Sequence, residues 1–548
     1  MRSRSRLVAL CVGLNVAESA LILGLDRNDA PSLATQASAI VPFGTFQDLR
    51  WMSVFQTSWL TFAAELAAML LVRAAITALS VRLAWPHSSA PPGLGRLFAQ
   101  GLLATAVSTV FLAPCVTLLF GLAVVPISWL FIAAVPLVVL VALVVHPIAV
   151  SGSWWRRALS VRALWWVVAT FVILDLAAVA TTEAPAPLRL VVAAAAGLFN
   201  AWAWVGLVSA IVVRAPARRI VPMVPAAMAV LVGVVIGGTL LGFNGAHPAA
   251  PGYSASGSRT DASGSTPLLI VSGYGSTWNG QPVHPIPGNF YELRFSYKGL
   301  ASDGQPLPYD EADTVKPLGR LEQMLADQVE VLYRQTHRRV DIASESEGAL
   351  IAETYVLADP GAPVRTAVYA SPLVDPGRVW YPVSRPTGWG IASAEAMQLL
   401  GRGFQSAAPI DLSPRSSFLA SLDEVAPLLQ TMYSCSVPGV RQFALLPLAD
   451  SVADPPGATF AFPTAVVPAF HGGLIPSHEG STVISNVLEG RPAGTSGIWE
   501  FLEDAVRDAA TAWQVPDLPV SDFPAGKSDP GACSALSREL ATHLGEAK

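Results

Sequence analysis

RVDIASESEGAL, residues 339–350, is the stretch that decides how the polar half of this 548-residue chain folds. Its β-type run, Val340 to Ala343, stops at the turn Ser344-Glu-Ser-Glu-Gly348, and a run of helix formers follows from Ala349 to Leu357. Strand, sharp turn and helix in this order place Ser346 at the apex of the turn, with its hydroxyl presented for chemistry. We therefore treat Ser346 as a candidate nucleophile.

Short β-type runs and helical periods alternate on both sides of this stretch. Residues 317–335 have apolar positions at a helical period, and residues 497–513 predict an amphipathic helix that closes the domain. The alternation predicts an α/β fold with a parallel sheet and helices on both faces. Residues 373–440 interrupt it and are expected to form a cap over the carboxyl edge of the sheet. The other predicted strands are 267–271, 291–297, 364–370, 441–447 and 464–468.

Two further polar residues follow predicted strands in an order that suits acyl transfer. Asp450 comes shortly after the fifth strand run and His471 shortly after the sixth. A nucleophilic serine needs a histidine to accept its proton and a carboxylate to orient that histidine. A parallel sheet gathers such residues at its carboxyl edge. Ser346, Asp450 and His471 are therefore the candidate catalytic residues.

Backbone N–H groups on either side of the serine are candidates for holding an oxyanion. The glycine-rich loop Ser272-Gly-Tyr-Gly275 offers the N–H of Tyr274, and the start of the following helix offers that of Glu347. The side chains of Glu347 and of Glu345, which flank Ser346, are expected to be solvated or ion-paired.

Each candidate has an alternative. Ser346 could serve only as a helix N-cap, a position that serine favours. His478 could take the place of His471, and Asp454 could take the place of Asp450.

At these residues the region 267–513 resembles the α/β-hydrolase fold, and more narrowly its lipase and esterase members. The turn around Ser346 resembles their G-x-S-x-G motif, with Ser344 in place of the first glycine. The loop Ser272-Gly-Tyr-Gly275 is similar to their H-G-x-G oxyanion loop, with the histidine replaced.

Two later segments add to the resemblance. His471-Gly-Gly-Leu-Ile-Pro-Ser477 is similar to the H-x-G-L-L run after the catalytic histidine of small bacterial lipases, and Ala449-Asp-Ser-Val452 is similar to the A-D-x-h-V run that carries their acid. The resemblance implies a cofactor-independent serine hydrolase acting on a carboxylic ester, such as a lipid or an acylated envelope component. An inactive binding or assembly module and a transporter with an outer domain are the alternatives.

The first 245 residues are expected to form a membrane domain. The chain is 52% hydrophobic and only 13% charged, whereas soluble domains carry roughly 25% charge. A Gly-, Ser- and Pro-rich linker, 246–266, precedes the α/β domain, 267–548. Seven runs approach the roughly 20 apolar residues that a membrane-spanning helix needs: 7–25, 53–76, 99–122, 124–146, 162–181, 188–213 and 220–243.

Arginine in alternate short loops predicts the orientation of these spans in a cell membrane. The arginine-rich N-terminus is expected in the cytoplasm, and an odd number of spans then places residues 267–548 outside. Residues 1–25 could instead be a signal peptide. Three carboxylates, Glu18, Glu65 and Asp175, fall inside predicted spans, either as buried partners of neighbouring polar groups or as parts of a proton or solute pathway.

Four cysteines occur, without C-x-x-C spacing, so neither a zinc nor a redox site is expected. Cys435 and Cys533 face an oxidising space in the predicted topology, and we expect them to form a disulfide instead of two free thiols. The net charge of -5 gives no reason to expect nucleic acid as a partner. The expected partners are the lipid bilayer and an ester substrate, and the sequence leaves the oligomeric state open.

Overall fold

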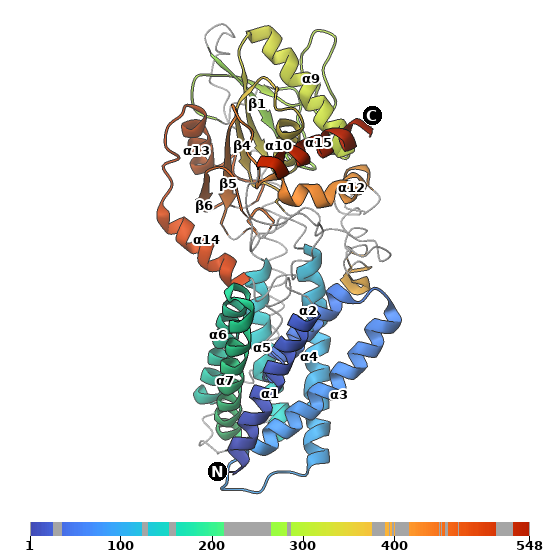
Figure 1. Ribbon diagram of the computed structural model, residues 1–548, viewed down its shortest axis with the longest axis vertical. Helices are drawn as coiled ribbons and strands as arrows, with labels where there is room; N and C mark the ends of the chain where they lie inside the picture. Colours follow the sequence, from blue (N-terminus) through green and yellow to red (C-terminus); the bar gives the residue numbers. More distant parts are fainter. Residues whose placement is uncertain are drawn as a thin grey trace.

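The computed structural model stacks a helical half and a sheet-containing half along its long axis (Figure 1). The predicted span 220–243, residues 246–264 of the predicted linker and most of the predicted cap lie outside the described residues. The structure describes residues 2–25, 36–122, 130–152, 160–212, 265–281, 286–374, 390–393, 395–396, 399, 416–448, 450, 452–454, 459–469, 471–510 and 530–546.

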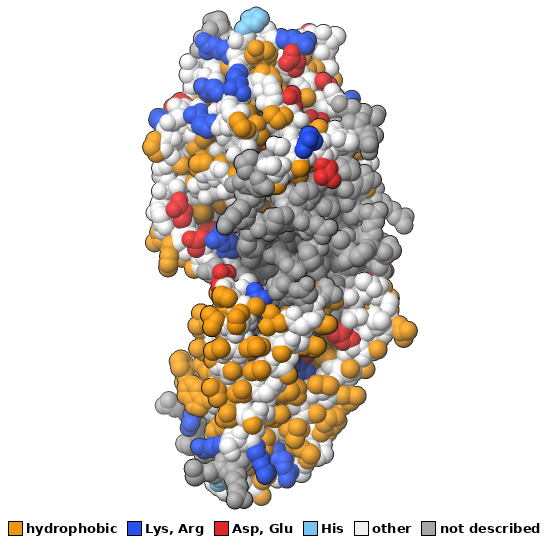
Figure 2. Space-filling model, in the orientation of Figure 1, with side chains coloured by type: hydrophobic (Ala, Val, Ile, Leu, Met, Phe, Trp, Pro, Cys, Tyr) orange, Lys and Arg blue, Asp and Glu red, His pale blue; other side chains and the backbone are white. Residues whose placement is uncertain are grey.

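Long apolar helices make up the first half, which agrees with the expected membrane domain. Five of the described helices are long and apolar enough to cross a bilayer, and α5 is a further apolar helix. Figure 2 shows their apolar side chains as a broad band across the visible face of this half. The helices are α1 (Arg2–Gly24), α3 (Trp59–Ala84), α4 (Leu94–Leu122), α5 (Leu130–Ser151), α6 (Val161–Glu183) and α7 (Ala186–Val212).

The segment between the predicted spans 7–25 and 53–76, which the span prediction leaves as a loop, contains most of a buried helix, α2 (Phe43–Phe55). Side chains of α2 such as Phe46 and Leu49 are at most 2% exposed, and the helix packs against α3 and α4. The loop prediction was wrong because the polar residues of α2 have partners inside the bundle. The predicted span 53–76 joined the end of α2 to α3, which begins separately at Trp59.

The second half contains a six-stranded sheet in the order β2-β1-β3-β4-β5-β6, and every neighbouring pair is parallel. This confirms the predicted parallel α/β architecture. The strands are β1 (Thr266–Val271), β2 (Phe290–Arg294), β3 (Val340–Glu345), β4 (Val364–Ala370), β5 (Arg441–Pro447) and β6 (Thr464–Val467).

Alternate side chains of the strands enter two separate cores, one on each face of the sheet. Leu269 and Val271 belong to the core beneath the helix layer α9, α10, α12 and α15, whereas Leu268 and Ile270 belong to the core beneath α13. The bounds of these helices are α9 (Leu318–Thr336), α10 (Glu347–Ala358), α12 (Ser417–Met432), α13 (His478–Leu488) and α15 (Pro530–Glu546).

The predicted cap, 373–440, is described only in part. It contains α12, which packs against α9, α10 and α15 and so belongs to the helix layer. Cys435, just after α12, forms the expected disulfide with Cys533 in α15. This bond ties the C-terminal helix to the layer that covers one face of the sheet.

The carboxyl edge of the sheet faces the helical half. Beyond the end of β4, the N–H of Ile391 donates to the Gln56 carbonyl (2.7 Å), and Ser393 Oγ donates to the Ser53 carbonyl (3.1 Å). The last carbonyls of a helix such as α2 receive no N–H from within the helix, so they are open to donors from another segment. The closing helix α14 (Gly497–Ala510) also contacts α6. The residues that follow the strands therefore lie toward the membrane half.

Candidate active site

Ser346 occupies a strained turn between β3 and α10. Its backbone has φ 58° and ψ -121°, a conformation that costs free energy for a residue with a side chain. The N–H of Ser346 donates to the Ala370 carbonyl (3.0 Å), and its carbonyl accepts the N–H of Ala349 (2.9 Å). Ser346 stands at the N-cap position of α10, but its side chain makes no capping hydrogen bond. The interpretation of its hydroxyl as a helix cap is therefore wrong.

Two residues of the turn explain how helix and strands approach so closely. Ser344, which stands where the resembled motif has glycine, is fully buried, and its Oγ donates to the Val368 carbonyl (3.0 Å). A Cβ atom on Gly348 would lie 2.6 Å from the carbonyl oxygens of Val271 and Ser272. A serine fits at position 344 because a carbonyl of β4 accepts its hydroxyl, whereas position 348 requires glycine.

A hydrogen-bonded chain joins the three residues singled out in the sequence. Ser346 Oγ lies 2.9 Å from His471 Nε2, and His471 Nδ1 lies 2.5 Å from Asp450 Oδ2. The side chains of His471 and Asp450 are each 1% exposed. An ionised Asp450 places the imidazole proton on Nδ1, so that Nε2 accepts from the serine hydroxyl.

Backbone donors fix the carboxylate of Asp450. Its Oδ1 accepts the N–H groups of Val452 (3.0 Å) and Ala453 (3.2 Å), which leaves Oδ2 directed at His471. The rival carboxylate, Asp454, pairs instead with Arg507 (3.0 Å). Burial raises the pKa of Asp454 to about 6, although the Arg507 guanidinium opposes that shift.

The rival histidine, His478, is the first residue of α13. Its carbonyl accepts the hydroxyl groups of Ser481 (3.2 Å) and Thr482 (2.6 Å). The structure thus brings His471, and not His478, to Ser346.

The loop after β1 lies directly against the serine. A Cβ atom on Gly273 would be 2.9 Å from Ser346 Cβ, so only glycine permits this approach. The loop is shaped by the N–H of Gly275, which donates to Thr314 Oγ1 (3.0 Å). Tyr274 lies between these glycines, and Glu347 begins α10, where backbone N–H groups have no acceptor within the helix. Both candidate oxyanion donors therefore belong to segments that converge on Ser346.

Glu345 is buried, so the expectation of a solvated carboxylate is wrong. Its Oε1 accepts the N–H groups of Leu474 (2.7 Å) and Ile475 (3.3 Å), in the segment that follows His471. Burial raises the pKa of Glu345, and the two backbone donors oppose the shift. Glu345 thereby connects the end of β3 to the segment that carries the histidine.

Glu347 is fully buried as well and contacts Tyr297, a residue that the sequence analysis did not single out. The Tyr297 hydroxyl donates to the Ser272 carbonyl (2.5 Å) and lies 2.9 Å from Glu347 Oε2. Burial raises the pKa of both groups well above their ordinary values. A protonated Glu347 can donate to the phenolic oxygen while Tyr297 donates to Ser272, which holds the loop after β1. No sequence motif marked Tyr297, because its partners are 25 and 50 residues away.

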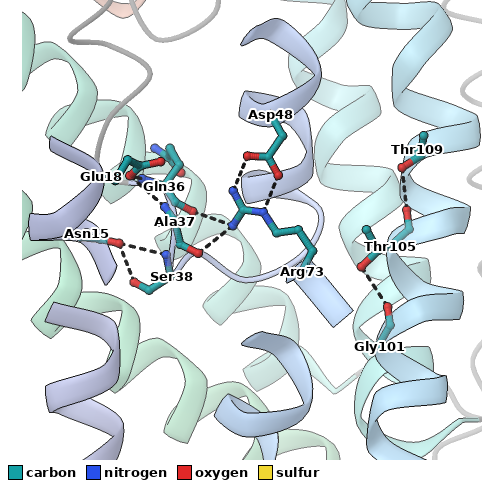
Figure 3. A network of polar contacts seen from close by, with 10 residues as sticks. All are labelled: Asn15, Glu18, Gln36, Ala37, Ser38, Asp48, Arg73, Gly101, Thr105 and Thr109. Carbon is teal, nitrogen blue, oxygen red and sulfur yellow. Dashed lines mark hydrogen bonds and ion pairs between the residues drawn. The ribbon is translucent and has the colours of Figure 1, made fainter. Parts of the chain in front are cut away.

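A second polar cluster lies inside the membrane half (Figure 3). Arg73 donates from Nε and Nη2 to the two oxygens of Asp48 (2.5 and 2.6 Å), and from Nη1 to the carbonyls of Gln36 (3.0 Å) and Ala37 (2.8 Å). Glu18 Oε2 accepts the N–H groups of the same two residues (2.9 and 3.0 Å). The cluster fastens the segment before α2 to α1 and α3.

The other two carboxylates that fall in predicted spans also have polar neighbours. Glu65 accepts a hydrogen bond from Gln56, and Asp175 lies within electrostatic reach of the buried Arg50. These contacts favour the interpretation of the carboxylates as buried partners.

The chain offers few other leads to a function. In the part that the structure describes, no group of three or more His, Cys, Asp and Glu side chains is placed to hold a metal ion. No protein-family model matches the chain, and neither a curated protein nor a solved structure matches it. Function is therefore inferred from the arrangement of Ser346, His471 and Asp450.

Proposed function

We propose that this chain is a membrane-anchored serine hydrolase of the esterase or lipase type, acting on a carboxylic ester. The observation that supports this proposal is the continuous chain of hydrogen bonds from Asp450 through His471 to Ser346. A serine that served only the fold would not need a strained backbone and a buried histidine–carboxylate pair aimed at its hydroxyl.

The proposed reaction begins with attack of Ser346 Oγ on the ester carbonyl while His471 Nε2 takes the hydroxyl proton. Asp450 keeps the imidazole in the required tautomer and stabilises its positive charge. The N–H groups of Tyr274 and Glu347 hold the oxyanion. His471 then gives its proton to the departing alcohol, and a water molecule releases the acyl group by the same steps. Another alcohol in place of water would give acyl transfer.

The α/β-hydrolase resemblance agrees with this arrangement, because serine, acid and histidine follow β3, β5 and β6. The two departures from the motifs do not weigh against it. Ser344 is accommodated through its bond to Val368, and Tyr297 supports the carbonyl of Ser272, the residue that replaces the motif histidine. The position of this edge beside the membrane half favours an ester that is lipid-like or part of the cell envelope.

We also propose that the α/β domain lies outside the cytoplasm and the N-terminus inside. The last turn of α3 carries Arg82 and the start of α4 carries Arg96, and these helix ends lie at the end of the helical half that also holds the N-terminus (Figure 1). Arginine in short loops favours the cytoplasmic side, and a disulfide in the α/β domain favours an oxidising space. Labelling of Thr260→Cys in whole cells by a membrane-impermeant maleimide tests this topology. Labelling only after lysis would contradict it.

Hydrolysis of p-nitrophenyl esters of increasing acyl length by the purified full chain tests the activity. We expect turnover by the wild type, none by Ser346→Ala, and full turnover by Ser434→Ala, which removes a serine hydroxyl of the same domain that bonds to Thr459. A folded wild type that hydrolyses no ester in the series would favour the inactive binding module. Activity retained in Ser346→Ala would exclude Ser346 as the nucleophile.

A further inference from the structure

Helix α14 exposes large apolar side chains, although it belongs to the α/β domain. Ile498 is 59% exposed, Phe501 is 68% exposed and Leu502 is 36% exposed. The sequence analysis expected the apolar side of this helix to close the domain, and for these three residues that expectation is wrong. Another surface has to account for them.

The exposed stripe and the domain contact lie on different faces of α14. At about 100° per residue, Ile498, Phe501 and Leu502 share one stripe. The side that packs on the domain is a different one, marked by Trp499 and by Glu503, which is 2% exposed. Because the domain contact uses its own face, the exposed stripe is additional to what the fold requires.

The position of α14 points to what covers the stripe. Figure 1 shows α14 running from the sheet domain to the end of α6 nearest the sheet, and the two helices are in contact. Outward side chains of α6, such as Leu176 at 58% exposure, belong to the apolar band of the membrane half. On the side of the sheet domain, Arg507 of α14 pairs with Asp454, in the segment after β5. Helix α14 is thus held beside the end of α6, where the lipid-facing surface of that helix ends.

We propose that α14 lies in the interface of the bilayer that α6 spans, with Ile498, Phe501 and Leu502 inserted among the lipids. In-plane helices bury their apolar face about 5–10 Å into the boundary between headgroups and acyl chains. Arg507 is the only basic residue of α14 and is already paired with Asp454 and Asp504. Apolar burial therefore drives the association, which makes it insensitive to salt and independent of anionic lipid. The inference does not depend on the proposed enzymatic activity.

Site-directed spin labelling of the full chain in phosphatidylcholine nanodiscs tests the proposal. Nitroxides are placed at Phe501→Cys and, as the matched control, at Glu500→Cys, an exposed position on a different face of the helix. Cys11→Ala and Cys115→Ala remove the two free thiols, and the Cys435–Cys533 disulfide stays intact. Collision rates with oxygen, which concentrates in lipid, and with a water-soluble nickel chelate give the depth of each label.

We expect the label at 501 to favour oxygen over the nickel chelate, at a depth of roughly 5 Å or more, and the label at 500 to favour the chelate. The contrast should be the same at low and high salt. Equal access of the chelate to both positions would overturn the proposal. Spin–spin coupling between two labelled copies, or a label at 501 that is shielded from both reagents, would overturn it in favour of a second copy or of another segment of this chain.

Discussion

Asp48 and Asp450 each hold a basic side chain in a hydrogen-bonded pair, the first in the membrane half and the second at the carboxyl edge of the sheet. Arg73 donates from its third nitrogen, Nη1, to two backbone carbonyls, so the Asp48 pair serves the fold. His471 instead directs its second nitrogen at Ser346, on a strained turn. The Asp48–Arg73 pair serves the fold, whereas the Asp450–His471 pair places a base beside the hydroxyl of Ser346.

This difference separates a stabilising pair from a reactive one. An ion pair that serves only the fold costs stability when one partner is removed, because the other charge stays buried with less compensation. A His–Asp pair that serves a nucleophile loses rate instead, because the geometry survives but the tautomer is wrong. Matched Asp→Asn substitutions at the two positions should therefore have opposite consequences.

The largest expected effect is that of Asp450→Asn on ester hydrolysis. We expect a fall of roughly 10⁴-fold in kcat, because the amide that replaces the carboxylate no longer holds the Nδ1 proton of His471. The apparent melting temperature should change little, since Val452 and Ala453 can still donate to the side-chain oxygen of that amide. Steady-state kinetics and thermal unfolding of the same preparation provide the check. A fall of less than tenfold would mean that the pair does not serve the serine.

The second prediction concerns Asp48→Asn, which leaves Arg73 buried with one partner weakened. We expect a loss of stability below the roughly 3–5 kcal/mol of a fully buried broken pair, because the Asp48 side chain is 26% exposed and Glu18 also lies near the Arg73 guanidinium. The activity per folded molecule should be unchanged. Size-exclusion recovery and unfolding in detergent measure the loss. Replacing both partners together, with Asp48→Leu and Arg73→Met, should restore part of it, and no recovery would contradict the account.

The third prediction separates the disulfide from the candidate site. Cys435 and Cys533 are 98 residues apart, and a closed loop of that size typically contributes about 2–4 kcal/mol. The double Cys→Ser variant should therefore melt at a lower temperature, as should the wild type under reductant, while its kcat at low temperature stays the same. A lost kcat in the folded variant would mean that the bond also shapes the site.

The smallest expected effect concerns the pH dependence of stability through Glu353, on α10. Burial raises the pKa of Glu353 to about 8 from an ordinary value of 4.5, although Tyr369 and Gln442 oppose the shift. Its contribution is therefore complete below pH 4.5 and is lost as the pH rises toward 8. Glu353→Gln stays neutral and should show a smaller fall in melting temperature between about pH 5 and 8. Equal pH profiles for variant and wild type would refute this role.

Much of the α/β half follows from local patterns in the sequence. The run predicted as a strand at 464–468 is β6, Thr464–Val467, and the helical period at 317–335 is α9, Leu318–Thr336. Ser346, Asp450 and His471 could be grouped because each follows a strand and parallel strands end at one edge. The hydrogen bonds among the three residues form because all three meet at that shared edge.

The features that could not be predicted from the sequence depend on contacts between residues far apart in the chain. Helix α2 is buried because Asp48 meets Arg73, and no pattern within α2 reveals that partner. Glu345 is buried because Leu474 and Ile475 supply donors from about 130 residues away. The amphipathic pattern of α14 was visible, but a stripe of this kind suits a core and a lipid surface equally well.

Reaction with a fluorophosphonate probe, followed by mass spectrometry of the tryptic peptide that contains Ser346, tests the central claim most directly. The account predicts one covalent adduct on Ser346 in the folded wild type, strongly slowed labelling in His471→Ala, and none in Ser346→Ala. A folded wild type that forms no adduct, or an adduct that persists at another serine in Ser346→Ala, would contradict it.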